Sequence, residues 1–187
     1  NNDSIDGGTF DNCANLKTVM FEDGTTEIAE GLFAGCTGIE QITIPDTVTV
    51  IESGAFGGCI NLKEIVVPDN VTEIQSSAFE YCSSLKTVKL SENLERIGVY
   101  AFGDCDVLKS IKIPDSVLDI DGAAFAECKE LSDVVLSKNL KTMGWQVFGN
   151  DNKLTEIEIP KSLEECRYYR NNDSIDGGTF DNCANLK

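Results

Sequence analysis

Residues 44–88 read IPDTVTVIESGAFGGCINLKEIVVPDNVTEIQSSAFEYCSSLKTV and contain nearly two copies of one unit. Phe56 and Phe79 occupy the same position in the two copies, and each stands three residues before a cysteine, Cys59 or Cys82. The same phenylalanine recurs every 23 residues, at Phe10, Phe33, Phe56, Phe79, Phe102, Phe125 and Phe148. A fixed period of this length is typical of a solenoid, in which each unit forms one turn of a coil.

Each unit carries apolar residues at constant distances from its phenylalanine. In the unit of Phe56 these are Leu62, Ile65, Val67 and Ile74. The alternation around Ile65 and Val67 predicts a short strand with one buried face, and the proline that follows in four units ends that strand. The A-F-x-x-C stretch predicts a tight turn or a short helical segment on the opposite side.

One unit cannot bury its apolar residues alone, so the units must stack and form buried ladders. We expect the ladders to consist of Phe33, Phe56, Phe79, Phe102, Phe125 and Phe148, and of Cys36, Cys59, Cys82, Cys105 and Cys128.

The frame L-x-x-[VI]-x-[IL]-P-x-x-[VL]-x-x-I-x-x-x-A-F-x-x-C resembles the BspA-like leucine-rich repeat of the Treponema pallidum type. The resemblance covers almost the whole chain. It implies an α/β solenoid: a right-handed leucine-rich repeat superhelix with a parallel concave β-sheet, about seven repeats plus a partial eighth. Residues 1–187 would then form a single domain. The resemblance also implies a cell-surface or secreted protein that mediates adhesion or protein binding without being an enzyme.

The two ends of the chain are identical: residues 1–17 and 171–187 both read NNDSIDGGTFDNCANLK. Either the natural protein carries a second period of 170 residues, or the end segment is an added copy that serves as a cap. We expect the former, which makes the chain part of a longer tandem array. The last unit is also lengthened, and we interpret residues 164–174 as an insertion.

Charge and composition exclude several classes of function. The chain has 32 acidic and 15 basic residues and a net charge of −17, which argues against a nucleic-acid partner. It has no apolar run of membrane-spanning length. It has no histidine, no phosphate-binding loop and no C-x-x-C pair, so we expect no enzyme activity, no cofactor and no metal site.

The cysteines occupy one ladder position in most units, but Asp151 stands there in the seventh. Aspartate cannot replace a disulfide partner, although it can accept hydrogen bonds from backbone amides in a turn. We therefore interpret the ladder as buried free thiols that satisfy loop backbone. Cys166 lies in the insertion, out of register. It is either a reactive or intermolecular thiol, or a half-buried residue at the base of the insertion.

Two groups of residues are candidates for binding. The first is a basic strip on the outward face of the predicted strands, formed by Lys63, Lys86, Lys89, Lys109 and Lys112. It favours an acidic protein or glycan as ligand; alternatively, the lysines only solvate the sheet. The second is in the insertion loop, Arg167, Tyr168, Tyr169 and Arg170, because tyrosine and arginine are enriched in binding hot spots. The alternative is that the tyrosines pack over the solenoid edge.

A structural role is the second hypothesis for function. The open ends of a solenoid are unpaired, and neither end of this chain reads as a polar capping unit. Tandem super-repeats could therefore self-associate end to end and form an extended fibre or stalk.

Overall fold

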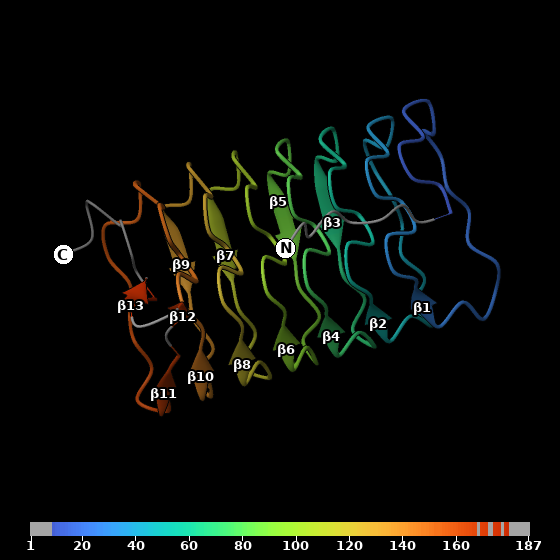
Figure 1. Ribbon diagram of the computed structural model, residues 1–187. Coiled ribbons are helices and arrows are strands. Elements are labelled where there is room, and N and C mark those ends of the chain that lie inside the picture. Colours follow the sequence, from blue (N-terminus) through green and yellow to red (C-terminus); the bar gives the residue numbers. More distant parts are fainter. Residues whose placement is uncertain (1–8, 168, 172–173, 177, 180–187) are drawn as a thin grey trace.

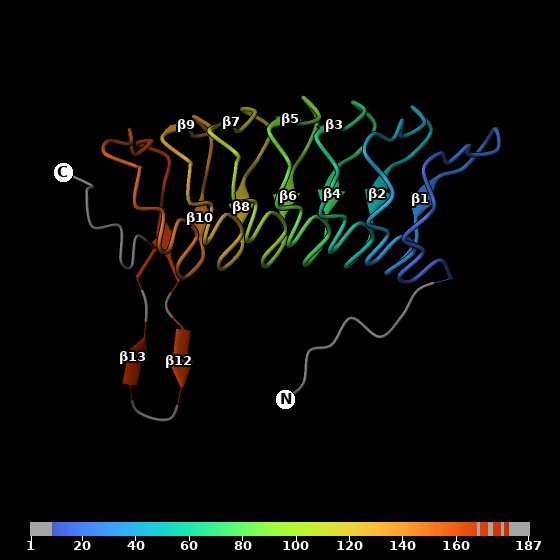
Figure 2. The same ribbon diagram turned by 90° about the horizontal axis from the view of Figure 1, so that it is seen from above.

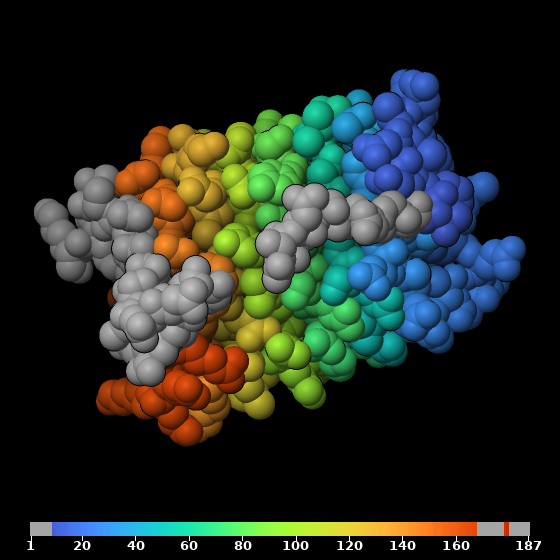
Figure 3. Space-filling model, viewed as in Figure 1, coloured from blue at the N-terminus to red at the C-terminus, as the bar shows by residue number. Residues whose placement is uncertain are grey.

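The computed structural model describes residues 9–167, 169–171, 174–176 and 178–179. Over this part the chain coils into an elongated stack, and the turns follow one another in sequence order (Figures 1 and 3). Residues 23 apart are partners in neighbouring strands, so each turn is one unit. The solenoid that the phenylalanine period predicts is confirmed.

One continuous parallel sheet of seven strands runs along the solenoid (Figure 1). Its strands are β1 (Glu27–Ile28), β2 (Val50–Ile51), β4 (Glu73–Ile74), β6 (Arg96–Ile97), β8 (Asp119–Ile120), β10 (Thr142–Met143) and β11 (Glu165–Cys166). From β1 to β10 the second residue of each strand is buried and the first faces outward. The sequence predicts the buried isoleucine ladder of this sheet, but not that these positions form strands.

The strand expected nine to eleven residues after each phenylalanine forms in four turns. β3 (Glu64–Val66) pairs in parallel with β5 (Thr87–Lys89), and β7 (Ser110–Lys112) pairs in parallel with β9 (Asp133–Val135). Pro68 and Pro114 follow β3 and β7 as expected, whereas the residues before Pro45 and Pro160 form no strand. Where a unit has serine instead, Ser91 or Ser137 is buried, and its hydroxyl accepts a hydrogen bond from the backbone N–H two residues on.

The α/β part of the expected class needs correction, because the described residues contain no helix. The A-F-x-x-C segments are turns, and a residue with positive φ recurs every four residues in them, for example Ser77 (56°) and Tyr81 (59°). Left-handed residues break an α-helix. Here they direct N–H groups to the next coil: Ser77 N–H donates to Val99 O at 2.8 Å and Tyr81 N–H to Gly103 O at 2.9 Å. No helix in this part could therefore cross a membrane.

The core consists of the expected ladders. The rings of Phe56, Phe79 and Phe102 stack with centroids 5.2 Å apart, and the six ladder phenylalanines from Phe33 to Phe148 are at most 1% exposed. Each buried cysteine donates its thiol to the phenylalanine carbonyl of the preceding turn, as Cys59 Sγ does to Phe33 O at 3.2 Å. The interpretation as free thiols that satisfy loop backbone is confirmed for the described ladder.

The insertion begins later than the sequence indicates. β11 pairs with β10 in the regular register, with Cys166 opposite Met143, and Arg167 N–H donates to Met143 O at 2.7 Å. Cys166 therefore continues the isoleucine ladder and is not out of register. The extra residues follow Arg167, where β12 (Tyr169–Asn171) and β13 (Ser174–Asp176) form an antiparallel hairpin that projects from the side of the solenoid (Figure 2).

Candidate binding surfaces

Four lysines of the basic strip lie on two neighbouring turns and face solvent. In β5 and β7 the central residue points toward the core, so Lys89 and Lys112 at the strand ends point outward. Lys86 and Lys109 precede the two strands and are also exposed. We call these four residues the four-lysine patch. Only hydroxyl side chains, Thr87 and Ser110, lie between the lysines on the outward face.

The fifth lysine of the strip behaves differently. Lys63 Nζ lies 2.5 Å from Glu40 Oε2 of the preceding turn, and this ion pair lowers the pKa of Glu40. Within the described residues, no carboxylate comes within ion-pair distance of the ammonium groups of Lys86, Lys89, Lys109 or Lys112. The patch therefore offers four cations without an ion-pair partner among these residues to the carboxylates, sulfates or phosphates of a ligand, although the charge of Lys112 contributes to the lowered pKa of Asp115.

The strands on either side of the patch carry both apolar and acidic residues. Val66 and Val135 occupy the same outward position as Lys89 and Lys112, and are 56% and 51% exposed. Beyond Val135 the row opens into a groove of about 380 Å³ whose lining includes Asp133, Glu156 and Glu158. The outward row therefore has cations in the middle and one valine on each side, while the exposed acids Glu64 and Asp133 lie opposite Thr87 and Ser110.

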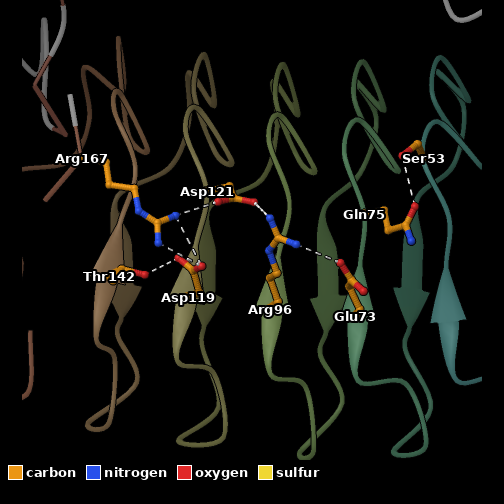
Figure 4. Close-up of polar contacts among 8 residues, drawn as sticks. All are labelled: Ser53, Glu73, Gln75, Arg96, Asp119, Asp121, Thr142 and Arg167. Atoms are coloured by element: carbon orange, nitrogen blue, oxygen red, sulfur yellow. Dashed lines mark hydrogen bonds and ion pairs between the residues drawn. The ribbon is translucent and has the colours of Figure 1, made fainter. Parts of the chain in front are cut away.

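A second charged cluster lies on the outward face of the seven-stranded sheet (Figure 4). Arg96 Nη2 contacts Asp121 Oδ2 at 2.6 Å, and Arg96 Nη1 contacts Glu73 Oε1 at 3.3 Å. Arg167 Nη1 lies 3.3 Å from Asp121 Oδ1 and 3.5 Å from Asp119 Oδ2. We call Glu73, Arg96, Asp119, Asp121 and Arg167 the Arg–Asp network.

The charged groups of the Arg–Asp network pair with one another. Partial burial alone lowers the pKa of the Arg96 guanidinium, but Asp121 and Glu73 outweigh it and raise that pKa. The side chain of Asp121 is only 11% exposed, and Thr142 donates its hydroxyl to Asp119. Sequence reasoning missed this cluster because its partners are 23 to 48 residues apart, so no local pattern marks them. The detectable signal was the charged residue before the buried isoleucine in successive units.

The structure separates the expected insertion-loop residues. Arg167 belongs to the last regular turn and contacts Asp119 and Asp121, so its guanidinium is already paired. Tyr169 and Arg170 contribute their backbone to β12 opposite Asp176 and Ile175. Tyr168 lies outside the described residues. Binding by this loop stays a prediction that concerns the hairpin.

The buried thiols are not candidates for chemistry. Burial raises the pKa of Cys59 to about 12, and raises the pKa values of Cys82, Cys105 and Cys128 well above the ordinary thiol range. A thiol must ionise to react as a nucleophile, so these residues are inert at neutral pH.

Asp151 differs from the cysteines whose position it takes. It is fully buried, and neither carboxyl oxygen has a hydrogen-bond partner among the described residues. No turn amide reaches full hydrogen-bond geometry among the described residues, although the backbone of Cys128 still favours the charged carboxylate, as the sequence suggests. Burial raises the pKa of Asp151 to about 8; the backbone of Cys128 opposes this rise and the charge of Glu127 adds to it.

These features define a leucine-rich repeat solenoid, and comparison with known proteins places it in a family. The family model of the BspA-type leucine-rich repeat region matches residues 1–107 and 49–187 in 6 copies. The chain therefore belongs to the BspA-type leucine-rich repeat family. A comparison with curated proteins found no match.

Solved bacterial structures show the same fold. The chain is 32% identical to a leucine-rich repeat protein from Bacteroides ovatus ATCC 8483, with a TM-score of 0.80 over 96% of this chain and 50% of that one. The T. pallidum leucine-rich repeat protein is 33% identical, with a TM-score of 0.72 over 75% of this chain and 67% of that one. A leucine-rich cell surface protein from Faecalibacterium prausnitzii A2-165 is 29% identical, with a TM-score of 0.56 over 95% of this chain and 54% of that one. The chain thus spans about half the length of the Bacteroides ovatus and Faecalibacterium proteins.

Proposed function

We propose that this chain is a non-enzymatic binding module, at the cell surface or secreted, that adheres to an acidic segment of another protein through the four-lysine patch. The location is supported by the name of the Faecalibacterium prausnitzii relative, a leucine-rich cell surface protein. The proposed mode of binding is supported by the outward face of β5 and β7.

One observation carries the proposal: four unpaired lysines gather on two neighbouring turns of a chain whose net charge is −17. Most lysines elsewhere in the described residues pair with an acid, as Lys63 and Lys153 do, and Lys17 and Lys161, which have no ion-pair partner there, lie apart from the patch in the sequence. Exposed ion pairs contribute little to stability, so leaving these lysines unpaired has a small energetic cost. Their arrangement is therefore explained better by an external anion than by the fold.

The ligand that fits this face is an extended, acidic peptide segment that crosses the two turns. Its carboxylates would meet the lysines, and apolar side chains at its ends would cover Val66 and Val135. Charge complementarity of this kind raises the association rate and decreases with ionic strength.

The test measures binding of the chain to immobilised poly-L-glutamate and to an array of matrix proteins and glycans. The variant Lys89→Glu/Lys112→Glu should weaken binding at least about tenfold, the effect of losing about 1.4 kcal/mol. The control Lys17→Glu/Lys161→Glu makes the same change in net charge at two exposed lysines outside β5 and β7. It should leave affinity within about twofold.

Two outcomes would count against the proposal. Equal losses in both variants would show that net charge matters and the patch does not. Binding restricted to the glycans of the array would exclude an acidic protein segment as the ligand.

A further inference from the structure

The row of strands that carries the four-lysine patch is interrupted at the patch itself. β3 pairs with β5 and β7 pairs with β9, but β5 and β7 belong to separate sheets although they lie on neighbouring turns (Figure 1). Lys86 and Lys89 lie on one side of the interruption, and Lys109 and Lys112 lie on the other. We call the contact between β5 and β7 the open junction, and the contacts β3–β5 and β7–β9 the paired junctions.

Two backbone hydrogen bonds beside the strands are missing at the open junction. At the paired junctions they are Lys86 N–H to Lys63 O (2.9 Å), Val67 N–H to Lys89 O (2.9 Å), Ser132 N–H to Lys109 O (3.0 Å) and Ile113 N–H to Val135 O (2.8 Å). The equivalent bonds at the open junction would join Lys109 N–H to Lys86 O and Leu90 N–H to Lys112 O. Neither is made, and these two N–H groups donate to no other backbone carbonyl among the described residues. Leu90 is only 3% exposed, and a buried backbone N–H without an acceptor is rare in folded proteins.

Charge distinguishes the open junction from the paired ones. In the paired ladders, Lys89 and Lys112 each stand opposite a valine. Pairing of β5 with β7 in the same register would set Lys89 opposite Lys112 and Lys86 opposite Lys109. Like charges directly opposite each other destabilise a sheet. The repulsion between these two lysine pairs therefore opposes the hydrogen bonds that the register would otherwise allow.

A third pair of lysines provides a comparison within the same row. Lys63 and Lys86 occupy the same position in consecutive turns, and yet Lys86 N–H donates to Lys63 O. The charge of Lys63 is neutralised by Glu40, whose Oε2 lies 2.5 Å from Nζ. Two lysines in register are thus compatible with backbone pairing where a carboxylate neutralises one of them. In the part of the chain that the structure describes, the lysines at the open junction have no such ion pair.

We propose that the four lysines hold the open junction apart, and that the carboxylates of a bound acidic segment close it, so that β3, β5, β7 and β9 form one sheet. This inference deepens the proposed function and rests on it for the ligand. A ligand carboxylate between Lys89 and Lys112 would act as Glu40 does on Lys63. Paired strands lie about 4.8 Å apart, so one carboxylate can reach an ammonium group on each strand.

Binding and closure must strengthen each other. A ligand shifts a conformational equilibrium only as far as it prefers one of the two states. Closure brings the opposing lysines together, so the closed junction attracts a carboxylate more strongly than the open one does. Neutralising one lysine of each pair by mutation should therefore close the junction without any ligand.

Hydrogen exchange of the Leu90 amide, followed by NMR, reports the closure. Saturating poly-L-glutamate should slow this exchange at least about tenfold, because the N–H group gains Lys112 O as its acceptor. The amide of Val67 already donates to Lys89 O, so it is the internal reference and should change less than about twofold. Calorimetric titration of the same samples measures binding separately from closure.

A pair of variants tests the role of the lysines in the absence of ligand. Lys109→Gln/Lys112→Gln removes one lysine from each opposing pair and leaves the turn of Leu90 unaltered. It should slow exchange of the Leu90 amide at least about tenfold without poly-L-glutamate. The control Lys17→Gln/Lys161→Gln makes the same change in net charge at two exposed lysines outside β5 and β7, and should leave this exchange unchanged.

The possible outcomes separate this inference from the proposed function. Poly-L-glutamate that binds without slowing Leu90 exchange would overturn the closure and leave the binding function intact. Unchanged Leu90 exchange in Lys109→Gln/Lys112→Gln, or equal slowing in the control, would show that the four lysines do not hold the junction apart. Absence of binding would contradict the proposed function and ligand-driven closure together, while the variants would still decide whether the lysines keep β5 and β7 unpaired.

Discussion

The middle turns of the solenoid and its last turn differ in whether their buried polar groups have hydrogen-bond partners and in whether their cations are paired with acids. In the middle turns, every ladder cysteine has a backbone acceptor and the phenylalanines stack with little exposure, while unpaired lysines face solvent. In the last turn, a carboxyl group replaces the thiol, and the half-buried cation Arg167 is paired with acids of an earlier turn. The irregular last turn therefore contains the buried carboxyl group, which lowers stability, whereas the regular middle turns carry the lysines that have no ion-pair partner.

This comparison changes where function should be sought. Irregularity in a repeat array often marks a binding loop, which makes the Tyr–Arg segment of the last turn the obvious candidate. The ion pairs of Arg167 remove one of its four residues from that role. The outward positions of regular units vary without disturbing the ladders beneath them, and this freedom allows the four-lysine patch to arise in the middle.

The largest expected effect is a loss of unfolding free energy when a phenylalanine in the middle of the ladder is replaced, compared with replacement of the first phenylalanine. Phe79→Ala removes a fully buried ring that stacks on both neighbours, so it should lower the free energy of unfolding by about 3–5 kcal/mol. Phe10→Ala removes a ring that is 43% exposed and should cost less than half as much. Urea denaturation followed by circular dichroism measures both. Equal costs would contradict the comparison.

The next effect concerns the buried carboxyl group of the last turn. The pKa of Asp151 is raised from 3.8 to about 8, so the folded chain binds this proton more tightly than the unfolded chain does. The contribution to stability is complete below pH 4 and is lost as the pH rises toward 8. Asp151→Cys restores the ladder residue and should stabilise the chain by a few kcal/mol at pH 8, since one pKa unit corresponds to about 1.4 kcal/mol.

The pH profile provides the control for this variant. Near pH 4, where Asp151 is neutral, the unfolding free energies of Asp151→Cys and of the unaltered chain should nearly coincide. The difference between the two should grow between pH 5 and pH 8. A difference that is constant over this range would show that the carboxyl group is charged throughout.

A third effect distinguishes the cysteines by burial. Cys166 in β11 is half-buried, whereas Cys105 and Cys128 in the middle turns are fully buried with raised pKa values. Brief treatment of the folded chain with iodoacetamide at pH 8 should alkylate Cys166 several-fold faster than the two others. Mass spectrometry of the digested protein measures the extents, and alkylation of Cys105 at the rate of Cys166 would contradict the buried ladder.

The smallest effect is expected from the Arg–Asp network. Arg167→Ala removes partly buried ion pairs that are 3.3 to 3.9 Å long, while Asp121 keeps its contact with Arg96. Because Arg96 still compensates the charge of Asp121, the cost should be at most about 1 kcal/mol, the upper end of the range for exposed ion pairs. Urea denaturation at low and at high salt measures it, and a cost above that of Phe10→Ala would show that this network stabilises the last turn far more than its exposure suggests.

The sequence predicts the repeated ladders far better than the contacts between distant units. The period of Phe56 and Phe79 suffices for the solenoid, because identical residues at a fixed spacing must stack. The seven-stranded sheet was missed because strands such as β4 have two residues, too few for an alternating pattern. The absence of helices from the described part of the chain follows from left-handed residues such as Tyr81, which a sequence does not mark unless they are glycines.

The candidate binding surfaces, too, could be predicted from the sequence only in part. The outward direction of Lys89 and Lys112 follows from strand alternation and could be predicted. The ion pair of Lys63 with Glu40 and the register of Cys166 could not, since both depend on which residues of neighbouring turns come into contact.

The most direct test of the account compares one variant from each region in the same binding assay. Lys89→Glu/Lys112→Glu alters the middle turns and Arg167→Glu alters the last turn, and both are measured against poly-L-glutamate and against any protein that the array identifies. The account predicts at least about a tenfold loss of affinity for the first variant and less than about a twofold change for the second. A tenfold loss in Arg167→Glu with unchanged binding in Lys89→Glu/Lys112→Glu would contradict it.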